Sequence, residues 1–110
     1  MFAPVEKLDR LTAIIDYNGW SAMGRTGGAM DPLASKWRTF GWAVKEIDGH
    51  DAGEIASVLS AVPFELGRPS AVIARTTKGK GVSFMENDLE WHYRPPNDED
   101  LRRALHEVGG

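Results

Sequence analysis

Hydrophobic residues are concentrated in three short runs, which predict three β-strands. Residues 11–17 (LTAIIDY) form a nearly continuous apolar run, a pattern typical of a strand that is buried on both faces in a parallel sheet. Residues 42–47 (WAVKEI) alternate between apolar and polar positions, which indicates a second strand. Residues 71–74 (AVIA) predict the third strand, which leads toward a glycine-rich turn at 78–81.

Three other segments carry apolar residues at helical spacing, and each begins at a residue that commonly caps a helix. Asp31 is a suitable N-cap, with Pro32 in the first helical position. Asp51 begins a second helix and forms a predicted capping box with Glu54, and Asn97 caps the last helix. The predicted apolar stripes are Leu33, Trp37 and Phe40; Ile55, Val58, Leu59 and Val62; and Leu101, Ala104, Leu105 and Val108.

The order of these elements predicts the fold class. Strands that alternate with helices indicate an α/β fold, in which a parallel sheet is flanked by helices. Residues 18–30 contain four glycines and are expected to form no regular element, whereas 78–96 form a long loop of the kind that is functional or disordered. Because unpaired strand edges favour association, the small sheet is expected to continue into a missing part or a partner.

Composition narrows the possible functions. The 110 residues suffice for one domain, and the formal net charge of −3 argues against a dedicated nucleic-acid binder. There is no cysteine, which excludes disulfides, thiolate metal sites and cysteine nucleophiles. No apolar run approaches the ~20 residues of a membrane span. We therefore expect no nucleic-acid partner, no membrane partner and a cytoplasmic location.

Polar and basic residues follow the first and third predicted strands. Ligands of open parallel sheets bind beyond the carboxyl ends of the strands, so Asn18, Lys78 and Lys80 are placed to hold an anion through a metal. Each residue also has a plainer interpretation, because Asn18-Gly19 is a common turn pair and the lysines suit a solvated loop. The lysines do not form a phosphate-binding P-loop, because no Ser or Thr follows Lys80.

The histidines give a weaker signal. His92 lies in a loop of mixed charge, where a histidine is more often a surface residue than a catalyst. The segment 48–51 (DGHD) has a catalytic appearance, but Asp51 is expected to cap a helix, and the members of a catalytic triad converge from separate segments. His106, on the last predicted helix, is expected at the surface.

Four segments carry a resemblance to a known family. They are AIIDYNG at 13–19, PLASKWRTFGW at 32–42, EIDGHD at 46–51 and ARTTKGKGVSFMENDLEWH at 74–92. Together they resemble the thiamine diphosphate-binding domain of transketolase, in the form found as the amino-terminal subunit of split transketolases. The resemblance runs from about residue 7 to the end of the chain, and its most specific part is the spacing of Lys78 and His92.

The resemblance implies a cofactor site. The Asn18 side chain and the Trp20 backbone carbonyl would bind Mg²⁺, a cation that prefers oxygen ligands. Lys78 would lie beside thiamine diphosphate, and His92 would contact the diphosphate and serve as a catalytic residue close to the reacting centre. Tyr93 stands where the family usually has glycine, which would narrow or re-aim this part of the site.

The resemblance also implies an activity that needs further chains. A transketolase moves a two-carbon ketol unit from a ketose phosphate to an aldose phosphate, with thiamine diphosphate as the electron sink. The family's Gly-Asp-Gly motif, whose Asp would bind Mg²⁺, does not occur in this sequence. Residues 1–110 are therefore expected to be a single partial domain, either truncated or encoded as a separate piece. It would need an amino-terminal half and a pyrimidine-binding domain subunit, function within an oligomer and be inactive alone.

Two alternatives stay open. The absence of Gly-Asp-Gly favours a non-catalytic assembly or regulatory fragment with the same fold. The unusual loop at 20–30 and Tyr93 favour another thiamine diphosphate enzyme, resembling a deoxyxylulose phosphate synthase or a natural-product carboligase.

Overall fold

The computed structural model describes residues 1–28 and 30–109, which divide into two compact units. Met1–Tyr17 with Gly27–Thr76 make up the first, here called the sheet unit. Asn18–Thr26 with Thr77–Gly110 make up the second, here called the loop unit. The chain thus leaves the sheet unit directly after its first strand, returns to it at residue 27 and leaves it again after its last strand. Residue 29, in the predicted loop 18–30, lies outside the described part.

The sheet unit is built on three parallel strands, as the sequence predicts. They are β1 (Thr12–Tyr17), β4 (Ala43–Asp48) and β5 (Ser70–Arg75), in the order β1-β5-β4. The strand that comes last in the sequence lies in the centre, and its residues 70–74 are all buried. A continuous apolar run is explained by this position, because a central strand is covered on both faces.

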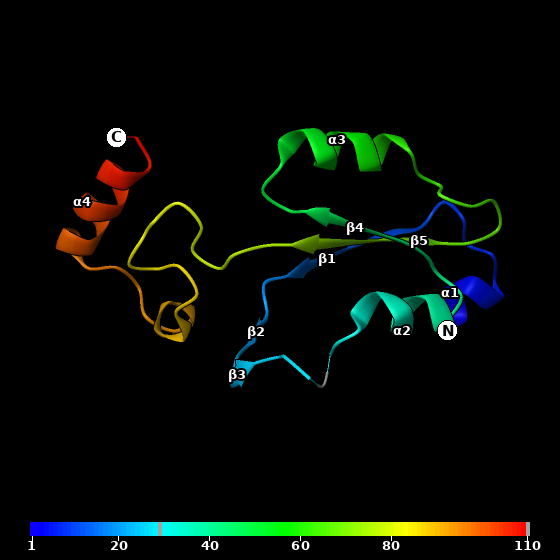
Figure 1. The fold of residues 1–110 in the computed structure, drawn as a ribbon, viewed down its shortest axis with the longest axis horizontal. Coiled ribbons are helices and arrows are strands. Elements are labelled where there is room, and N and C mark those ends of the chain that lie inside the picture. Colours follow the sequence, from blue (N-terminus) through cyan, green and yellow to red (C-terminus); the bar gives the residue numbers. More distant parts are fainter. Residues whose placement is uncertain (29, 110) are drawn as a thin grey trace. The chain divides into compact units, whose positions relative to one another are not determined.

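Helices cover opposite faces of this sheet (Figure 1). α2 (Leu33–Thr39) lies on one face, where Leu33 and Ala34 pack against Ile73 of β5 in the main hydrophobic core. α3 (Ala52–Ser60) lies on the other face and buries Val58. A short helix that the sequence pattern did not predict, α1 (Phe2–Val5), precedes β1.

The expectation that the first strand is buried on both faces was wrong. Ile14 of β1 is 61 % exposed, whereas Ile15, its neighbour on the other face, packs against the core. β1 is an edge strand of the described sheet, and α3 packs over β4 on the face that carries Ile14. An apolar run therefore correctly indicated a strand, but it did not report whether a layer covers each face.

The predicted helix starts were right to within one residue, but the predicted capping interactions were partly wrong. Pro32 rather than Asp31 occupies the N-cap of α2, and the Asp31 carboxylate instead accepts a hydrogen bond of 2.7 Å from the Tyr17 hydroxyl. Asp51 does cap α3 by accepting a bond of 3.0 Å from the backbone N–H of Glu54. The Glu54 carboxylate does not complete the box, because it accepts from the Asp48 N–H at 2.8 Å.

The loop unit contains more regular structure than the sequence predicts. Part of the segment 18–30 forms a small antiparallel hairpin of β2 (Trp20–Ser21) and β3 (Gly24–Arg25), which corrects the expectation of an irregular loop. A 3₁₀ helix, η1 (Leu89–His92), interrupts the long loop, and α4 (Asp98–Glu107) follows it. Gly24, with φ of +145°, takes a conformation that side chains rarely adopt, which explains a glycine in the hairpin.

α4 begins as predicted but leaves its apolar side uncovered. Asn97 accepts bonds from the backbone N–H groups of Glu99 and Asp100, and the Asp100 carboxylate accepts from the Asn97 N–H, which completes a capping box. Leu101 and Leu105 are 48 % and 51 % exposed. Within the described residues, no helix is long and apolar enough to cross a membrane.

Candidate functional site

The hairpin that follows β1 carries two of the predicted site residues, Asn18 and Trp20. The Asn18 side-chain oxygen accepts a hydrogen bond of 2.9 Å from the Trp20 backbone N–H, and the Gly19 carbonyl accepts one of 2.9 Å from Thr26. Asn18 therefore makes the hydrogen bond that is typical of an Asn-Gly turn, as the plainer interpretation of this residue predicts. An amide oxygen has two lone pairs, however, and one of them is left for another partner.

Two polar atoms in the same hairpin are buried without a hydrogen-bond partner among the described residues. They are the indole N–H of Trp20 and the hydroxyl of Thr26. The Arg25 guanidinium lies 4.4 Å from the centre of the Trp20 ring and stacks over it. Buried polar groups are nearly always paired in native proteins, so the hairpin has hydrogen-bonding capacity that the described residues do not satisfy.

Lys78 and His92 lie side by side in the loop unit, although 14 positions separate them in the sequence. The ammonium nitrogen of Lys78 is 3.4 Å from Nδ1 of the His92 ring. Lys78 begins the turn that follows β5, and its carbonyl accepts a hydrogen bond of 2.9 Å from the Asn87 N–H. His92 is the last residue of η1, whose first turn is capped by the Asp88 carboxylate, which accepts from the Glu90 N–H at 2.9 Å.

A close approach of two backbone segments shapes the turn after Lys78. Gly79 has φ of +73°, and a Cβ atom at this position would lie 2.5 Å from the Met85 carbonyl oxygen. No larger residue fits there without a shift of the backbone. Lys80 projects to a different neighbour, the Glu86 carboxylate, at 4.0 Å. The structure therefore separates the two lysines, and of these two only Lys78 contacts His92.

Tyr93 is accommodated without backbone strain. Its φ of −114° and ψ of −30° are ordinary for any residue with a side chain, so this backbone does not need the glycine that the family usually has. The Tyr93 ring meets the His92 ring edge to face, with 5.2 Å between the ring centres, and remains 63 % exposed. The extra side chain thus packs against the candidate histidine.

Aromatic rings and ion pairs hold the segment around His92. The indole N–H of Trp91 donates a bond of 2.9 Å to the Phe84 carbonyl, and the two rings meet at 5.5 Å. Arg94 stacks over Trp91 and pairs with Glu90 at 2.9 Å and with Asp100 at 3.0 Å. The hydrogen bond to Glu90, followed by the attraction of Asp100, raises the pKa of Arg94 above its ordinary value.

Glu107 links the end of α4 to the turn at Ser83. The Glu107 carboxylate accepts hydrogen bonds from both the backbone N–H and the hydroxyl of Ser83. These two bonds, the backbone one first, lower the pKa of Glu107 below its ordinary value, because both favour the charged carboxylate. The loop unit is therefore tied together at a second point, away from His92 in the sequence.

The segment 48–51 has the structural role that the sequence predicts. Asp48 accepts a hydrogen bond of 2.9 Å from the His50 N–H, and Asp51 caps α3. Gly49 is required by close packing, since a Cβ atom there would lie 2.5 Å from the Thr76 side chain. His106 lies exposed on α4, also as predicted.

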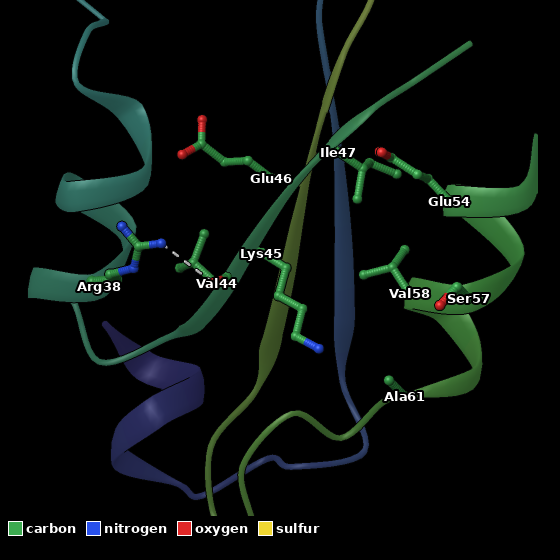
Figure 2. Close-up of a pocket in the computed structure, with 9 residues that line it drawn as sticks. All are labelled: Arg38, Val44, Lys45, Glu46, Ile47, Glu54, Ser57, Val58 and Ala61. Carbon is green, nitrogen blue, oxygen red and sulfur yellow. Dashed lines mark hydrogen bonds between the residues drawn. The ribbon is translucent and has the colours of Figure 1, made fainter. Parts of the chain in front are cut away.

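An open pocket of about 460 Å³ lies along the β4 edge of the sheet unit, between α2 and α3 (Figure 2). Lys45 and Ile47 of β4 lie on its α3 side, and Val44 lies on its α2 side. The pocket is also lined by Arg38, Glu46, Glu54, Ser57, Val58 and Ala61. None of the four predicted site residues lines it, so this pocket and the predicted site are different places.

The structure therefore brings the predicted site residues together in two pairs. Asn18 contacts Trp20, and Lys78 contacts His92; all four belong to the loop unit, and no hydrogen bond joins the two pairs within the described part of the chain. Sequence reasoning missed the unpartnered polar atoms of Trp20 and Thr26. No pattern signalled them, because burial of a single polar atom depends on how the hairpin folds.

Comparison with known proteins identifies relatives along nearly the whole chain. The family model "Transketolase, thiamine diphosphate binding domain" matches residues 1–109. A 6-deoxy-6-sulfo-D-fructose transketolase subunit, SqwG, of Clostridium sp. (strain MSTE9) is 40% identical over 98% of this chain and 40% of its own length. An apulose-4-phosphate transketolase subunit of Phocaeicola vulgatus is 38% identical over 93% of this chain and 37% of its own.

A solved transketolase structure has the same fold over nearly the whole chain. The transketolase of Campylobacter jejuni superposes with a TM-score of 0.88 and 30% identity, over 98% of this chain and 17% of its own. This chain thus spans 40% or less of the length of these relatives. The match over residues 1–109 shows that the chain belongs to the transketolase thiamine diphosphate-binding domain family.

Proposed function

We propose that this chain supplies part of the diphosphate-binding side of a thiamine diphosphate-dependent transketolase. The reaction would transfer a two-carbon ketol unit from a ketose phosphate to an aldose phosphate. The observation that carries the proposal is the pairing of Lys78 with His92 in a chain whose residues 1–109 match the family. The ammonium and imidazole groups are both able to donate hydrogen bonds to phosphate oxygens.

The chemistry of Lys78 and His92 fits the anionic end of the cofactor. Lys78 provides an ammonium group, and His92, whose Nδ1 lies 3.4 Å from it, can bind the same anion through its other ring nitrogen, Nε2. His92 is exposed, so an incoming ligand has access to its ring. Both residues would bind and orient the diphosphate, and His92 would also move a proton close to the reacting centre.

The chemistry of Asn18 and Trp20 fits Mg²⁺. The Asn18 amide oxygen keeps one lone pair beyond its bond to Trp20, and the Trp20 carbonyl would add a second oxygen. Among residues 1–28 and 30–109, no three His, Cys, Asp or Glu side chains are grouped to hold a metal. These two oxygens would be this chain's ligands, and the Asp of the Gly-Asp-Gly motif on the amino-terminal half, phosphate oxygens and water would complete the octahedron.

The cofactor, when bound, supplies the nucleophilic carbon and the electron sink for the cleavage of the ketose. The chain would contribute binding and orientation at the diphosphate end. An amino-terminal half and a pyrimidine-binding domain subunit would supply the other parts of the active site. The assembly would be a cytoplasmic oligomer that takes part in carbohydrate metabolism, in the pentose phosphate pathway. The chain alone would be inactive.

The names of two relatives support a class of substrate. One acts on 6-deoxy-6-sulfo-D-fructose and the other on apulose-4-phosphate, and both sugars carry an anionic group. We extend this to the present protein and propose that its donor is a ketose with a phosphate or sulfonate group. Donors of both kinds belong in the assay described next.

Reconstitution tests this proposal. The chain is assembled with an upstream half that carries Gly-Asp-Gly and with a pyrimidine-domain subunit, and ketol transfer is measured with thiamine diphosphate and Mg²⁺. His92→Ala should lower kcat/KM by about 10²–10⁴-fold, the range for loss of a positioned acid or base. His106→Ala is the matched control, because His106 is exposed on α4, and it should leave the rate unchanged. An assembled complex that binds both partners yet transfers no ketol unit would contradict the proposal.

A further inference from the structure

We propose that Lys78 acts through His92: its ammonium group selects the tautomer of the imidazole ring and so turns Nε2 into a hydrogen-bond donor. The inference deepens the proposed function, on which it rests for the identity of the anion. It makes Lys78 a positioning residue for His92, in addition to any direct contact with the diphosphate. The atoms that meet between the two side chains supply the reason.

The contact constrains where the hydrogen of the ring lies. A lysine ammonium group has three donors and no acceptor, and it faces Nδ1 of His92 at 3.4 Å. Nδ1 can take part in this hydrogen bond only through its lone pair. A neutral imidazole carries one hydrogen, so that hydrogen must then be on Nε2.

The ring is held on more than one side. The Tyr93 ring lies edge to face against His92, with an angle of 86° between the planes. A half-turn of the imidazole about its bond to Cβ would replace Nδ1 by a carbon atom and lose the bond to Lys78. The surrounding backbone is also fixed, because Gly79 lies against the Met85 carbonyl and Asp88 caps η1.

The other ring nitrogen is left for a ligand. Nε2 of His92 has no hydrogen-bond partner among the described residues, and the His92 side chain is exposed. With its hydrogen on Nε2, the ring presents an N–H to an anion and lies beside a lysine of positive charge. With the hydrogen on Nδ1 instead, Nε2 would present a lone pair, which an anion does not accept.

Lys80 provides a matched comparison in the same turn. It has the same side chain two residues later, but its ammonium group pairs with Glu86 at 4.0 Å. Any general effect of positive charge in this turn would be removed by Lys80→Met as well as by Lys78→Met. An effect through the contact with Nδ1 would be removed by Lys78→Met alone.

Nuclear magnetic resonance of the full chain, labelled with ¹⁵N-histidine and free of cofactor, measures the tautomer directly. Long-range ¹H–¹⁵N spectra at a pH well above the histidine range, about 8.5, should show His92 with a protonated Nε2 and an unprotonated Nδ1. The His92→Gln variant identifies the signals of this ring among the three histidines. Because no cofactor is present, the result is independent of whether ketol transfer is ever observed.

Variants decide whether Lys78 is the cause. Lys78→Met should bring the two nitrogen shifts of His92 closer together as the Nδ1–H tautomer becomes populated, whereas Lys78→Arg, which keeps a donor, and Lys80→Met should leave them apart. If Lys78→Met does not fold, Lys78→Ala removes the same ammonium group with a smaller side chain. A native ring protonated on Nδ1, or shifts that do not respond to loss of the ammonium group at position 78, would overturn the inference.

Discussion

The sheet unit and the loop unit are each stabilised internally by a different kind of interaction. In the sheet unit, the central strand β5 is buried from residue 70 to residue 74, and parallel ladders pair it on both sides. In the loop unit, Asp100 is the only buried residue of the described part, and hydrogen bonds, ring contacts and ion pairs connect the segments. All four predicted site residues belong to the loop unit. The buried apolar residues and the predicted site residues thus belong to different segments of this chain.

This division has a physical reason. A buried strand satisfies its backbone groups through ladders and leaves its side chains to packing, so it has few polar groups to offer a ligand. Segments beyond strand ends expose polar side chains and are positioned by local contacts. Mutations that remove buried apolar surface should therefore destabilise the sheet unit, and mutations that change local backbone geometry should disturb the loop unit.

The largest effect is expected from Ile73→Ala in the centre of the sheet unit. Ile73 is fully buried in the main core, so loss of its side chain should lower the free energy of unfolding by about 2–5 kcal/mol. Urea denaturation followed by circular dichroism measures this change. Ile14→Ala is the matched control, because Ile14 lies 61 % exposed on β1 and should cost far less. Equal losses from both variants would contradict the burial argument.

Gly79→Ala should disturb the loop unit by a different route. The new methyl group would meet the Met85 carbonyl oxygen at 2.5 Å, and the left-handed backbone alone costs about 1–2 kcal/mol for a residue with a side chain. The Asn87 amide, which bonds to the Lys78 carbonyl, should then exchange its hydrogen faster. Gly67→Ala separates the cost of the left-handed backbone from the cost of the close contact, since Gly67 has φ of +76° but nothing within 4 Å of the added Cβ. An Asn87 exchange rate unchanged by Gly79→Ala would show that the close approach to Met85 is not a constraint.

Loss of an N-cap compares the two units directly. Asn97→Ala removes a cap with two accepted bonds and a completed box, and it should cost about 1 kcal/mol and fray the first turn of α4. Asp51→Ala removes a single accepted bond from α3 and should cost less. Amide exchange in the first turn of each helix measures both effects. A larger loss at α3 would mean that the second bond accepted by the Asn97 side chain adds nothing to the cap.

The smallest expected effect is the dependence of the stability of the loop unit on pH. The folded-state pKa of Glu107 is lowered by its bonds from Ser83, so the stabilisation is present above the unfolded pKa and is lost as the pH falls through the folded one. A carboxyl titration by nuclear magnetic resonance should place Glu107 below its ordinary value. Ser83→Ala should raise this pKa only in part, because the backbone N–H, the larger cause, remains. A titration at the ordinary value in the native chain would argue against the link.

Local patterns predicted most elements of the sheet unit correctly. Apolar runs located the three strands to within one residue, and Asp51 was correctly predicted as the cap of α3, as was Asn97 as the cap of α4 in the loop unit. Each of these features depends on neighbours within a few positions of the sequence. The Asn18–Trp20 bond is equally local, since it spans two residues.

Features that depend on distant segments could not be predicted in this way. The exposed side of β1 follows from its position at the edge of the described sheet, and Asp31 has a partner 14 positions away in Tyr17 instead of the helix start. The pairs between strands that are far apart in the sequence place β5 between β1 and β4. No periodicity within a single strand carries this information.

By itself, the sequence determined the three strands of the sheet, the three helices that alternate with them and the order of these elements, because hydrophobic periodicity and capping act over one or two turns of chain. The tertiary structure alone decided which of two similar lysines contacts His92 and which atom of the ring it meets. Such a contact needs Gly79 to pass against Met85 and η1 to bring His92 back toward the turn. These are distances between segments, and they are set only when the chain folds.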